Sequence, residues 1–292
     1  MSDYLKSSLA VGLFRVLGML PLSWVYGLSK LTLLLMLRLP NQSLKQTRLN
    51  VQRCWPNLTC QQQTALVGES MLHTIYAALE MGINWTQPSQ SGLDRIINVS
   101  GADCLRQAQL MGGVILLTPH LGNWELFANW AAHEAKVTAL YKPAKLHGLD
   151  RLIHGARTQA GMQLAPASAK GVMQLKRALL KGEVNLILPD QEPPPKAGII
   201  SQWFNQPAYT MTLVSQLAKT KNTRVLIGFA RRVPSSLGFI IELEDITEVC
   251  QQATIESSVK AINQAIEELV RRAPEQYQWE YRRFKHTLEQ EH

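Results

Sequence analysis

The chain has 292 residues, which is enough for one large domain or two small ones with a sizeable core. Hydrophobic residues make up 46% of the sequence and charged residues 18%, a balance that excludes long disordered stretches. The formal net charge of +8 favours an anionic partner: nucleic acid, an anionic membrane or an acidic protein.

The spacing of cysteines and histidines predicts neither a disulfide framework nor a metal site. No Cys-x-x-Cys pair occurs among the four cysteines, which favours reduced thiols in a protein that faces the cytoplasm. No second histidine follows His133 and Glu134 at the distance that a zinc-binding helix requires. The sequence therefore predicts no bound metal ion and no other cofactor.

Residues 5–39 are apolar but interrupted by charged residues and by Pro21. A helix that spans a bilayer takes about 20 mostly apolar residues, and no uncharged stretch here is long enough. We expect two amphipathic helices that meet at Pro21 and lie in the membrane interface. A single tilted span, with Lys30 extending to the interface, is the alternative. A cleaved signal peptide is disfavoured, because the charges are scattered and no small-residue cleavage pattern follows.

The next segment contains helical patterns before and after a short strand pattern. Residues 58–84 carry an apolar stripe at helical spacing, with Thr59 in position to cap the helix. Residues 87–92 are rich in turn-forming residues and predict a connector, after which residues 96–99 predict a strand. Residues 103–111 then predict a short helix.

The stretch 112–125 joins a predicted buried strand to a predicted helix. It begins with an apolar run that Pro119 ends, because proline has no N–H for a sheet ladder. Large aromatic side chains then recur at helical spacing, at Trp124, Phe127 and Trp130. This spacing predicts a helix that begins near Asn123. His120 therefore lies in the turn between strand and helix, where reactive groups are often presented.

His120 and Glu125 are five residues apart, a spacing that places them on different faces of one continuous helix. They meet only if His120 precedes the helix and folds back over its first turn. In that arrangement the Glu125 carboxylate holds one imidazole nitrogen and leaves the other free to accept a proton. The alternative is a structural histidine at a helix start, with a glutamate that interacts favourably with the helix dipole.

Strands and helices continue to alternate after this stretch. Residues 137–141 and 184–188 predict two further strands, and residues 172–181 predict a helix between them. This order predicts an α/β fold with a mixed, mostly parallel central sheet flanked by helices, preceded by an N-terminal membrane-associated helical segment. Asp190 and Gln191 follow the second of these strands, at the end where open α/β sheets place their sites.

Basic residues follow the strand at residues 137–141. Lys142 closes that strand, and Arg151 and Arg157 lie in the segment after it. One interpretation of these side chains is a solvated helix face. The other is an anion-binding group, because a guanidinium stays charged and binds oxyanions through two hydrogen bonds.

The C-terminal third contains a further helix–strand–strand–helix pattern. Residues 210–220 predict a helix, and residues 225–229 and 239–243 predict two strands. Residues 255–270 form a clean amphipathic helical pattern. The tail, residues 274–285, mixes aromatic and basic residues, which by residue type alone predict a helix end and no particular function.

The motif from His120 to Glu125 resembles the His-x-x-x-x-Asp/Glu motif of the lysophospholipid acyltransferase superfamily. Its His-x-Gly-x-Trp-Glu form is similar to that of the late acyltransferases of bacterial lipid A biosynthesis. Residues 203–208 resemble a block of that family written Phe-Phe-Gly-x-Pro-Ala, with Asn205 in place of a glycine; both residue types tolerate a positive φ. The tail at residues 274–285 is the second strong signature, and the match extends in order over nearly the whole chain.

The resemblance implies that His120 is a general base toward an acceptor hydroxyl, with Glu125 as its partner. It also implies an acyl-carrier-protein thioester as donor and a lipid A precursor as acceptor. The oxyanion that forms during transfer needs positive or N–H groups, for which the backbone near Asn123 and the Arg157 side chain are candidates. The predicted substrate-binding residues are Arg157, Asn123, Lys142, Arg151, Asp190 and Gln191.

The resemblance further implies an N-terminal hydrophobic anchor. Residues 1–40 are therefore predicted to be a membrane-anchoring helical segment, and residues 41–292 the acyltransferase domain. The expected location is the bacterial inner membrane, with the catalytic domain on the cytoplasmic face and membrane lipid as a partner.

Two alternatives remain open at this point. An enzyme of the same type would acylate a lysophospholipid or another glycolipid instead of a lipid A precursor. A non-enzyme alternative is a peripheral membrane or nucleic-acid-binding module in which His120 is structural, but no known nucleic-acid motif appears and we expect no nucleic-acid partner. No Gly-x-Ser-x-Gly elbow occurs, so the sequence favours direct transfer over an acyl-serine intermediate.

Overall fold

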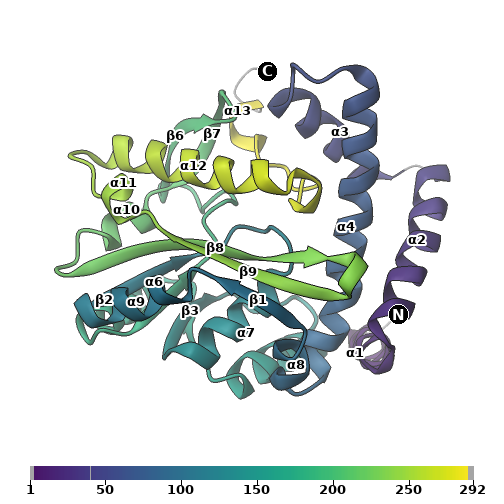
Figure 1. Cartoon of the computed structure of the whole chain (residues 1–292), viewed down its shortest axis with the longest axis horizontal. Helices are drawn as coiled ribbons and strands as arrows, with labels where there is room; N and C mark the ends of the chain where they lie inside the picture. The colour runs from purple at the N-terminus through teal and green to yellow at the C-terminus, as the bar shows by residue number, and fades with distance from the viewer. Residues whose placement is uncertain (1–2, 40, 289–292) are drawn as a thin grey trace.

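The computed structural model of the chain describes residues 3–39 and 41–288 and is built around one twisted sheet (Figure 1). The described residues form this sheet from seven strands, in the spatial order β1 (Ile96–Ser100), β9 (Gly238–Asp245), β8 (Thr223–Val233), β2 (Gly113–Leu117), β5 (Val184–Ile187), β3 (Val137–Tyr141) and β4 (Gln163–Pro166). Neighbouring strands are parallel except β8 and β9, which run antiparallel. The predicted α/β fold with a mixed, mostly parallel sheet is confirmed.

Helices cover both faces of the sheet, and the side chains of β2 show how. Ile115 and Leu117 belong to one core cluster, whereas Val114 and Leu116 belong to another, because successive side chains of a strand point to opposite faces. The first cluster includes residues of α9 (Ala169–Leu180) and α12 (Ile255–Arg272); the second includes residues of α6 (Ala102–Met111) and α7 (Trp124–Glu134). β2 is therefore buried on both faces, and its carboxyl end opens at the edge of the sheet where His120 follows.

A long helix, α4 (Cys60–Thr86), stands at one end of the sheet and supports the N-terminal helices (Figure 1). Thr59 caps α4 through a reciprocal pair of hydrogen bonds with Gln62, as its sequence predicted. α1 (Asp3–Met19) crosses α4 so closely that a Cβ added to Gly18 would lie 2.6 Å from the carbonyl oxygen of Gly82.

The N-terminal segment contains the two predicted helices, α1 and α2 (Leu22–Arg38), with the break at Pro21. Within the described residues, no single helix has the length and apolar composition needed to cross a bilayer. Among the residues that the structure describes, α2 taken together with α3 (Gln42–Cys54) is the one pair that meets those criteria, and it is bent by 86°. The predicted domain boundary at residue 40 lies outside the described residues.

Two sequence predictions need correction. The predicted connector at residues 87–92 contains a short helix, α5 (Ser89–Leu93). The predicted helix at residues 210–220 begins instead as a strand: β6 (Gly198–Trp203) and β7 (Gln206–Met211) form an antiparallel hairpin, followed by a short helix. Phe204 and Asn205 adopt positive φ values of 47° and 59° in the hairpin turn, which fits the tolerance predicted for Asn205.

The remaining elements are α8 (His147–Gln159), α10 (Leu213–Leu217), α11 (Thr247–Cys250), α13 (Lys285–Leu288) and the 3₁₀ turns η1 (Pro234–Ser236) and η2 (Pro274–Gln276).

Candidate active site

The turn between β2 and α7 is held in shape by its own backbone and by the strand beside it. Gly122 adopts a φ of 62°, and a Cβ added there would lie 2.1 Å from the carbonyl oxygen of Ala230, so the position requires glycine. Asn123 caps α7, because its side-chain oxygen accepts a hydrogen bond from the Leu126 N–H at 2.9 Å. The helix therefore begins at Trp124, as the sequence predicted.

The C-terminal tail holds the same turn from the other side. The Gly122 N–H donates to the Gln276 carbonyl at 3.1 Å, and the Gln278 N–H donates to the His120 carbonyl at 3.0 Å. Arg283, buried in the tail, donates to the Tyr209 carbonyl at 2.6 Å and thereby ties the tail to the β6–β7 hairpin. The aromatic-basic tail is thus part of the site, a role that its residue types alone did not predict.

His120 is bonded to Asp190, which follows β5. The imidazole Nδ1 lies 2.8 Å from Asp190 Oδ1, and the His120 backbone N–H donates to Asp190 Oδ2, also at 2.8 Å. Asp190 is 1% exposed; burial favours its neutral form, but the electrostatic interaction and hydrogen bonds with His120 outweigh this and lower the Asp190 pKa. The Tyr277 hydroxyl, whose pKa burial raises well above its usual value, also bonds Asp190.

These contacts fix the roles of the two imidazole nitrogens. An ionised carboxylate only accepts hydrogen bonds, so the Nδ1 of His120 carries a hydrogen. The amide nitrogen of Gln191 only donates, so its contact with Nε2 requires a lone pair there. The side-chain nitrogen of Gln191 lies 3.2 Å from Nε2 and donates to it. The predicted pair Asp190 and Gln191 is therefore brought directly onto the histidine.

Glu125 is bonded to Arg157 rather than to His120. Arg157 Nε donates to Glu125 Oε2 at 3.2 Å, and Arg157 Nη2 donates to Oε1, which makes a two-point ion pair. Burial alone would lower the pKa of Arg157, but the Glu125 carboxylate raises it. The predicted hydrogen bond from Glu125 to the imidazole is not among those of the described residues, because the first turn of α7 directs this carboxylate toward α8.

A cavity of about 400 Å³ lies beside these residues. Trp124, Glu125 and Arg157 line one side of it, and the His120 ring lies against Trp124 with 5.2 Å between the ring centroids. The opposite side comes from α4 and the tail, through His73, Thr74, Ala77, Gln278 and Glu280 among others. The cavity thus connects five distant parts of the sequence, because Phe14 of α1 lines it as well.

Glu280 adds a second carboxyl group to this cavity. Burial raises its pKa, although the Thr74 hydroxyl donates to Glu280 Oε2 at 3.0 Å and partly offsets the effect. The sequence analysis did not single out either residue. Glu280 lies in the aromatic-basic tail, two residues before the pair Arg282 and Arg283, and an acid so close to these arginines was the available signal.

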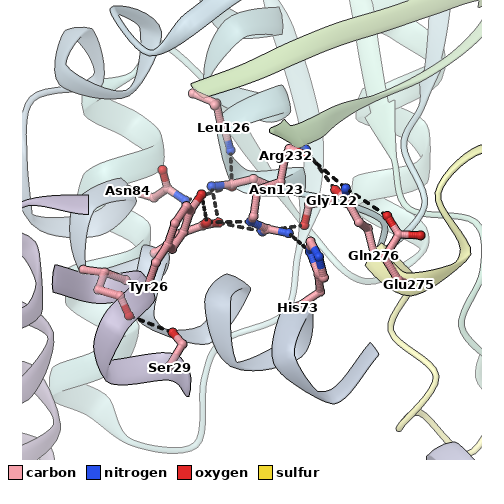
Figure 2. A network of polar contacts seen from close by, with 12 residues as sticks. Tyr26, Ser29, His73, Asn84, Gly122, Asn123, Leu126, Arg232, Glu275 and Gln276 are labelled. Atoms are coloured by element: carbon pink, nitrogen blue, oxygen red, sulfur yellow. Dashed lines mark hydrogen bonds and ion pairs between the residues drawn. The ribbon is translucent and has the colours of Figure 1, made fainter. Parts of the chain in front are cut away.

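A buried ion pair contacts the turn, within a network of polar contacts that Figure 2 shows. Arg232 of β8 donates from Nε and Nη2 to the two oxygens of Glu80 of α4, both at 2.6 Å, and these side chains are 0% and 2% exposed. Nη2 also donates to the Gly122 carbonyl at 3.3 Å. His73 lies 3.1 Å from Arg232 Nη1; burial, with the charge of Arg232, lowers the pKa of His73 to about 3, so this ring is neutral.

The same network reaches the helix cap and the N-terminal segment. The Asn123 amide donates to Glu80 at 3.0 Å, while Asn123 Oδ1 accepts from the Asn84 amide at 2.9 Å. The Tyr26 hydroxyl of α2 donates to Glu80 at 3.1 Å (Figure 2). Charged residues inside apolar helical and strand patterns were the signal for Glu80 and Arg232, and the sequence analysis missed both.

The other predicted binding residues lie apart from the cavity or are occupied. The Asn123 side chain is 2% exposed and fully engaged in the network, and its backbone N–H already donates to the Ala230 carbonyl at 2.9 Å. Lys142 is exposed beyond the end of β3. Arg151 is exposed and lines a separate groove between α1 and α8. Of the predicted oxyanion donors, Arg157 is the one that lines the cavity.

Comparison with known proteins identifies the chain's relatives. The sequence model of the bacterial lipid A biosynthesis acyltransferase family matches residues 1–286. The chain is 26% identical over 290 residues to a lipid A biosynthesis lauroyltransferase of Escherichia coli (strain K12), covering 97% of this chain and 92% of that protein. It is also 26% identical to a lipid A biosynthesis palmitoleoyltransferase of the same organism, over 82% of this chain and 77% of the relative.

A lipid A biosynthesis acyltransferase of Haemophilus influenzae is a further relative, 25% identical over 79% of this chain and 72% of its own length. The family match, over residues 1–286, includes both the histidine turn and the cavity walls described above. They exclude the alternative of a non-enzyme binding module, because family and relatives alike are acyltransferases. The chain is an acyltransferase and belongs to the bacterial lipid A biosynthesis acyltransferase family.

Proposed function

We propose that the chain transfers a fatty acyl group from an acyl-carrier-protein thioester to a hydroxyl of a lipid A precursor. The observation that carries this proposal is the His120 imidazole, whose Nδ1 is bonded to buried Asp190 and whose ring packs on a wall of the cavity. A histidine oriented by a carboxylate and left with one basic nitrogen is the arrangement that activates a hydroxyl.

In the proposed reaction the acceptor hydroxyl gives its proton to His120 Nε2 as its oxygen attacks the thioester carbonyl carbon. The C–S bond then breaks, the carrier's thiolate leaves, and His120 returns the proton to that sulfur. Gln191, which donates to Nε2, gives way to the hydroxyl. No acyl-enzyme forms along this path.

Arg157 is the proposed donor to the oxyanion. It uses Nε and Nη2 to bind Glu125, which leaves the Nη1 hydrogens for a substrate oxygen in the cavity. Glu125 then contributes to the reaction by orienting and partly neutralising Arg157. The direct His120–Glu125 dyad is the competing version of this proposal, and the substitutions described in the Discussion separate the two.

The donor and acceptor are tested with the purified full-length protein. We expect transfer of an acyl chain from acyl carrier protein to a lipid A precursor, detected as a mass increase of the glycolipid. Because acyl carrier protein is strongly acidic and the chain carries a net charge of +8, the rate should fall as the salt concentration rises. Acylation of lysophospholipid without acylation of any lipid A precursor would contradict the proposal.

We further propose that α1 and α2 attach the protein to the cytoplasmic face of the bacterial inner membrane. Their outer faces expose large apolar side chains, which include Leu9, Leu13, Val16, Leu31, Leu34 and Leu35. An apolar face of this kind on a short helix inserts at the boundary between headgroups and acyl chains. Four free cysteines in the described residues agree with a reducing compartment.

The triple substitution Leu31→Ser, Leu34→Ser and Leu35→Ser is expected to weaken binding to phosphatidylglycerol vesicles about tenfold or more. These side chains are each more than half exposed, so their loss removes membrane contacts and spares the core. Vesicle sedimentation measures the change. The control replaces Leu110 and Leu180, exposed leucines on α6 and α9, with serine. Equal loss in both variants would show that α2 is not the attachment surface.

A further inference from the structure

A groove of about 790 Å³ lies between α1 and α8, separate from the proposed catalytic residues. α1 contributes Ser8, Val11 and Arg15 to its wall, and α8 contributes Arg151 and Gly155 among others. Gly12 on α1 and Gly155 on α8 line the groove, and a Cβ added at either would meet no atom of the described residues within 4 Å beyond the backbone of its own helix. Its size is sufficient for a sugar phosphate headgroup.

The described residues that line the groove include two arginines and no aspartate or glutamate. Neither Arg15 nor Arg151 has an ion pair or side-chain hydrogen bond to another described residue, and both are exposed. Asp150, the acid next to Arg151 in sequence, faces elsewhere: it accepts hydrogen bonds from the Tyr141 hydroxyl and, at 2.8 Å, from the Ala144 N–H. The side chains that line the groove therefore carry positive charge, and no carboxylate among the described lining residues neutralises it.

The position of the groove defines the kind of anion that it would take. Trp85 lines both this groove and the 400 Å³ cavity, so one ligand could extend from one into the other. α1, which forms one wall, also exposes Leu9, Leu13 and Val16. An occupant of the groove thus lies between the surface proposed to meet the membrane and the proposed catalytic residues.

We propose that this groove binds a phosphate group on the headgroup of the glycolipid acceptor, through Arg15 and Arg151. The inference rests on the proposed function, since it assigns a place to part of the same acceptor. Guanidinium groups bind phosphate through two hydrogen bonds and stay charged, which suits a phosphate presented at a membrane surface. The phosphate fixes the headgroup while the acylated hydroxyl reaches past Trp85 toward His120.

The test compares a phosphorylated lipid A precursor with the same precursor after phosphatase treatment. Full-length Arg15→Ala, Arg151→Ala and double variants are assayed for acyl transfer to both acceptors. Arg177→Ala is the matched control, because Arg177 is an exposed arginine on α9 that lines neither the groove nor the cavity. It removes the same charge from the protein at a different place.

Each groove variant is expected to raise the KM for the phosphorylated precursor about tenfold, and the double variant more, while the KM for the acyl donor is unchanged. The preference for phosphorylated over phosphatase-treated precursor should fall by the same factor. Arg177→Ala should keep the preference of the unsubstituted protein. Equal KM values in groove variants and control, or an increased KM for the acyl donor instead, would overturn the proposal.

Binding without catalysis separates this inference from the proposed function. Phosphorylated and phosphatase-treated precursors in detergent micelles are titrated into the protein in the absence of acyl donor. Tighter binding of the phosphorylated form, lost in the double variant, supports the phosphate site in the groove even if no acyl transfer occurs. Absence of acyl transfer would refute only the proposed function. If phosphatidylglycerol competes as strongly as the phosphorylated precursor, the groove binds any anionic lipid. That result would contradict a site specific for the acceptor.

Discussion

His120→Ala is expected to lower kcat for acyl transfer by about 10²–10⁴-fold while the protein stays folded. The substitution removes the imidazole that Asp190 orients. The proposed acceptor of the hydroxyl proton is then missing. Steady-state transfer to a lipid A precursor measures kcat, and circular dichroism checks the fold. The control is His133→Ala, which removes an exposed histidine from the last turn of α7. Near-normal turnover by folded His120→Ala would exclude base catalysis by this residue.

Two carboxylate substitutions tell which acid supports His120. Asp190→Asn keeps the shape but replaces an oxygen that accepts from Nδ1 with a group that donates, which favours the wrong imidazole tautomer. Glu125→Gln weakens the ion pair with Arg157 instead. If Asp190 orients the base, Asp190→Asn shifts the lower limb of the pH–rate profile and Glu125→Gln does not. The reverse result would support the direct His120–Glu125 dyad.

Arg232→Ala is expected to destabilise the protein by about 3–5 kcal/mol, because it leaves the Glu80 carboxylate buried without its cation. The loss also frees the Gly122 carbonyl, so the histidine turn loses a support. Denaturant unfolding measures the change in free energy. Arg224→Ala on the same strand is the control: its pair with Asp245 is partly exposed and should be worth about 1 kcal/mol or less.

A double variant separates an uncompensated charge from a general loss of packing. Replacing Glu80 with Leu as well as Arg232 with Met removes both charges, and should recover part of the stability lost when only Arg232 is replaced. A free-energy loss for Arg232→Ala no greater than that for Arg224→Ala would contradict the importance of the buried pair. Activity of the stable double variant then reports how far the turn depends on this network.

Sequence alone predicted the elements whose signals are local. The apolar run ending at Pro119 and the helical spacing that begins near Asn123 placed the histidine turn correctly, because strand, breaker and helix start act within a few residues. The helix at residues 255–270 was equally clear, since amphipathic spacing is set by one buried face. The mistaken helix at residues 210–220 began as a strand, because pairing with β6 outweighed the helical pattern.

The contacts between residues far apart in the sequence could not be predicted from local signals. His120 and Asp190 are 70 residues apart in the sequence, and they meet because β2 and β5 are parallel neighbours whose carboxyl ends share one edge of the sheet. Strand order does not follow from propensities, so the nearer acid, Glu125, was the natural candidate. The Glu80–Arg232 pair spans 152 residues and depends on how α4 packs beside β8.

The hydrogen bond from Tyr26 to Glu80 couples the unfolding of α2 to the buried ion pair. Lifting α2 from α4 would strip a donor from a carboxylate that is 2% exposed and would uncover Val25, which is fully buried. The free energy of that event is set by the same buried charges that hold the histidine turn. We therefore expect α2 and the catalytic turn to open cooperatively, so that amide protons of both exchange with solvent together.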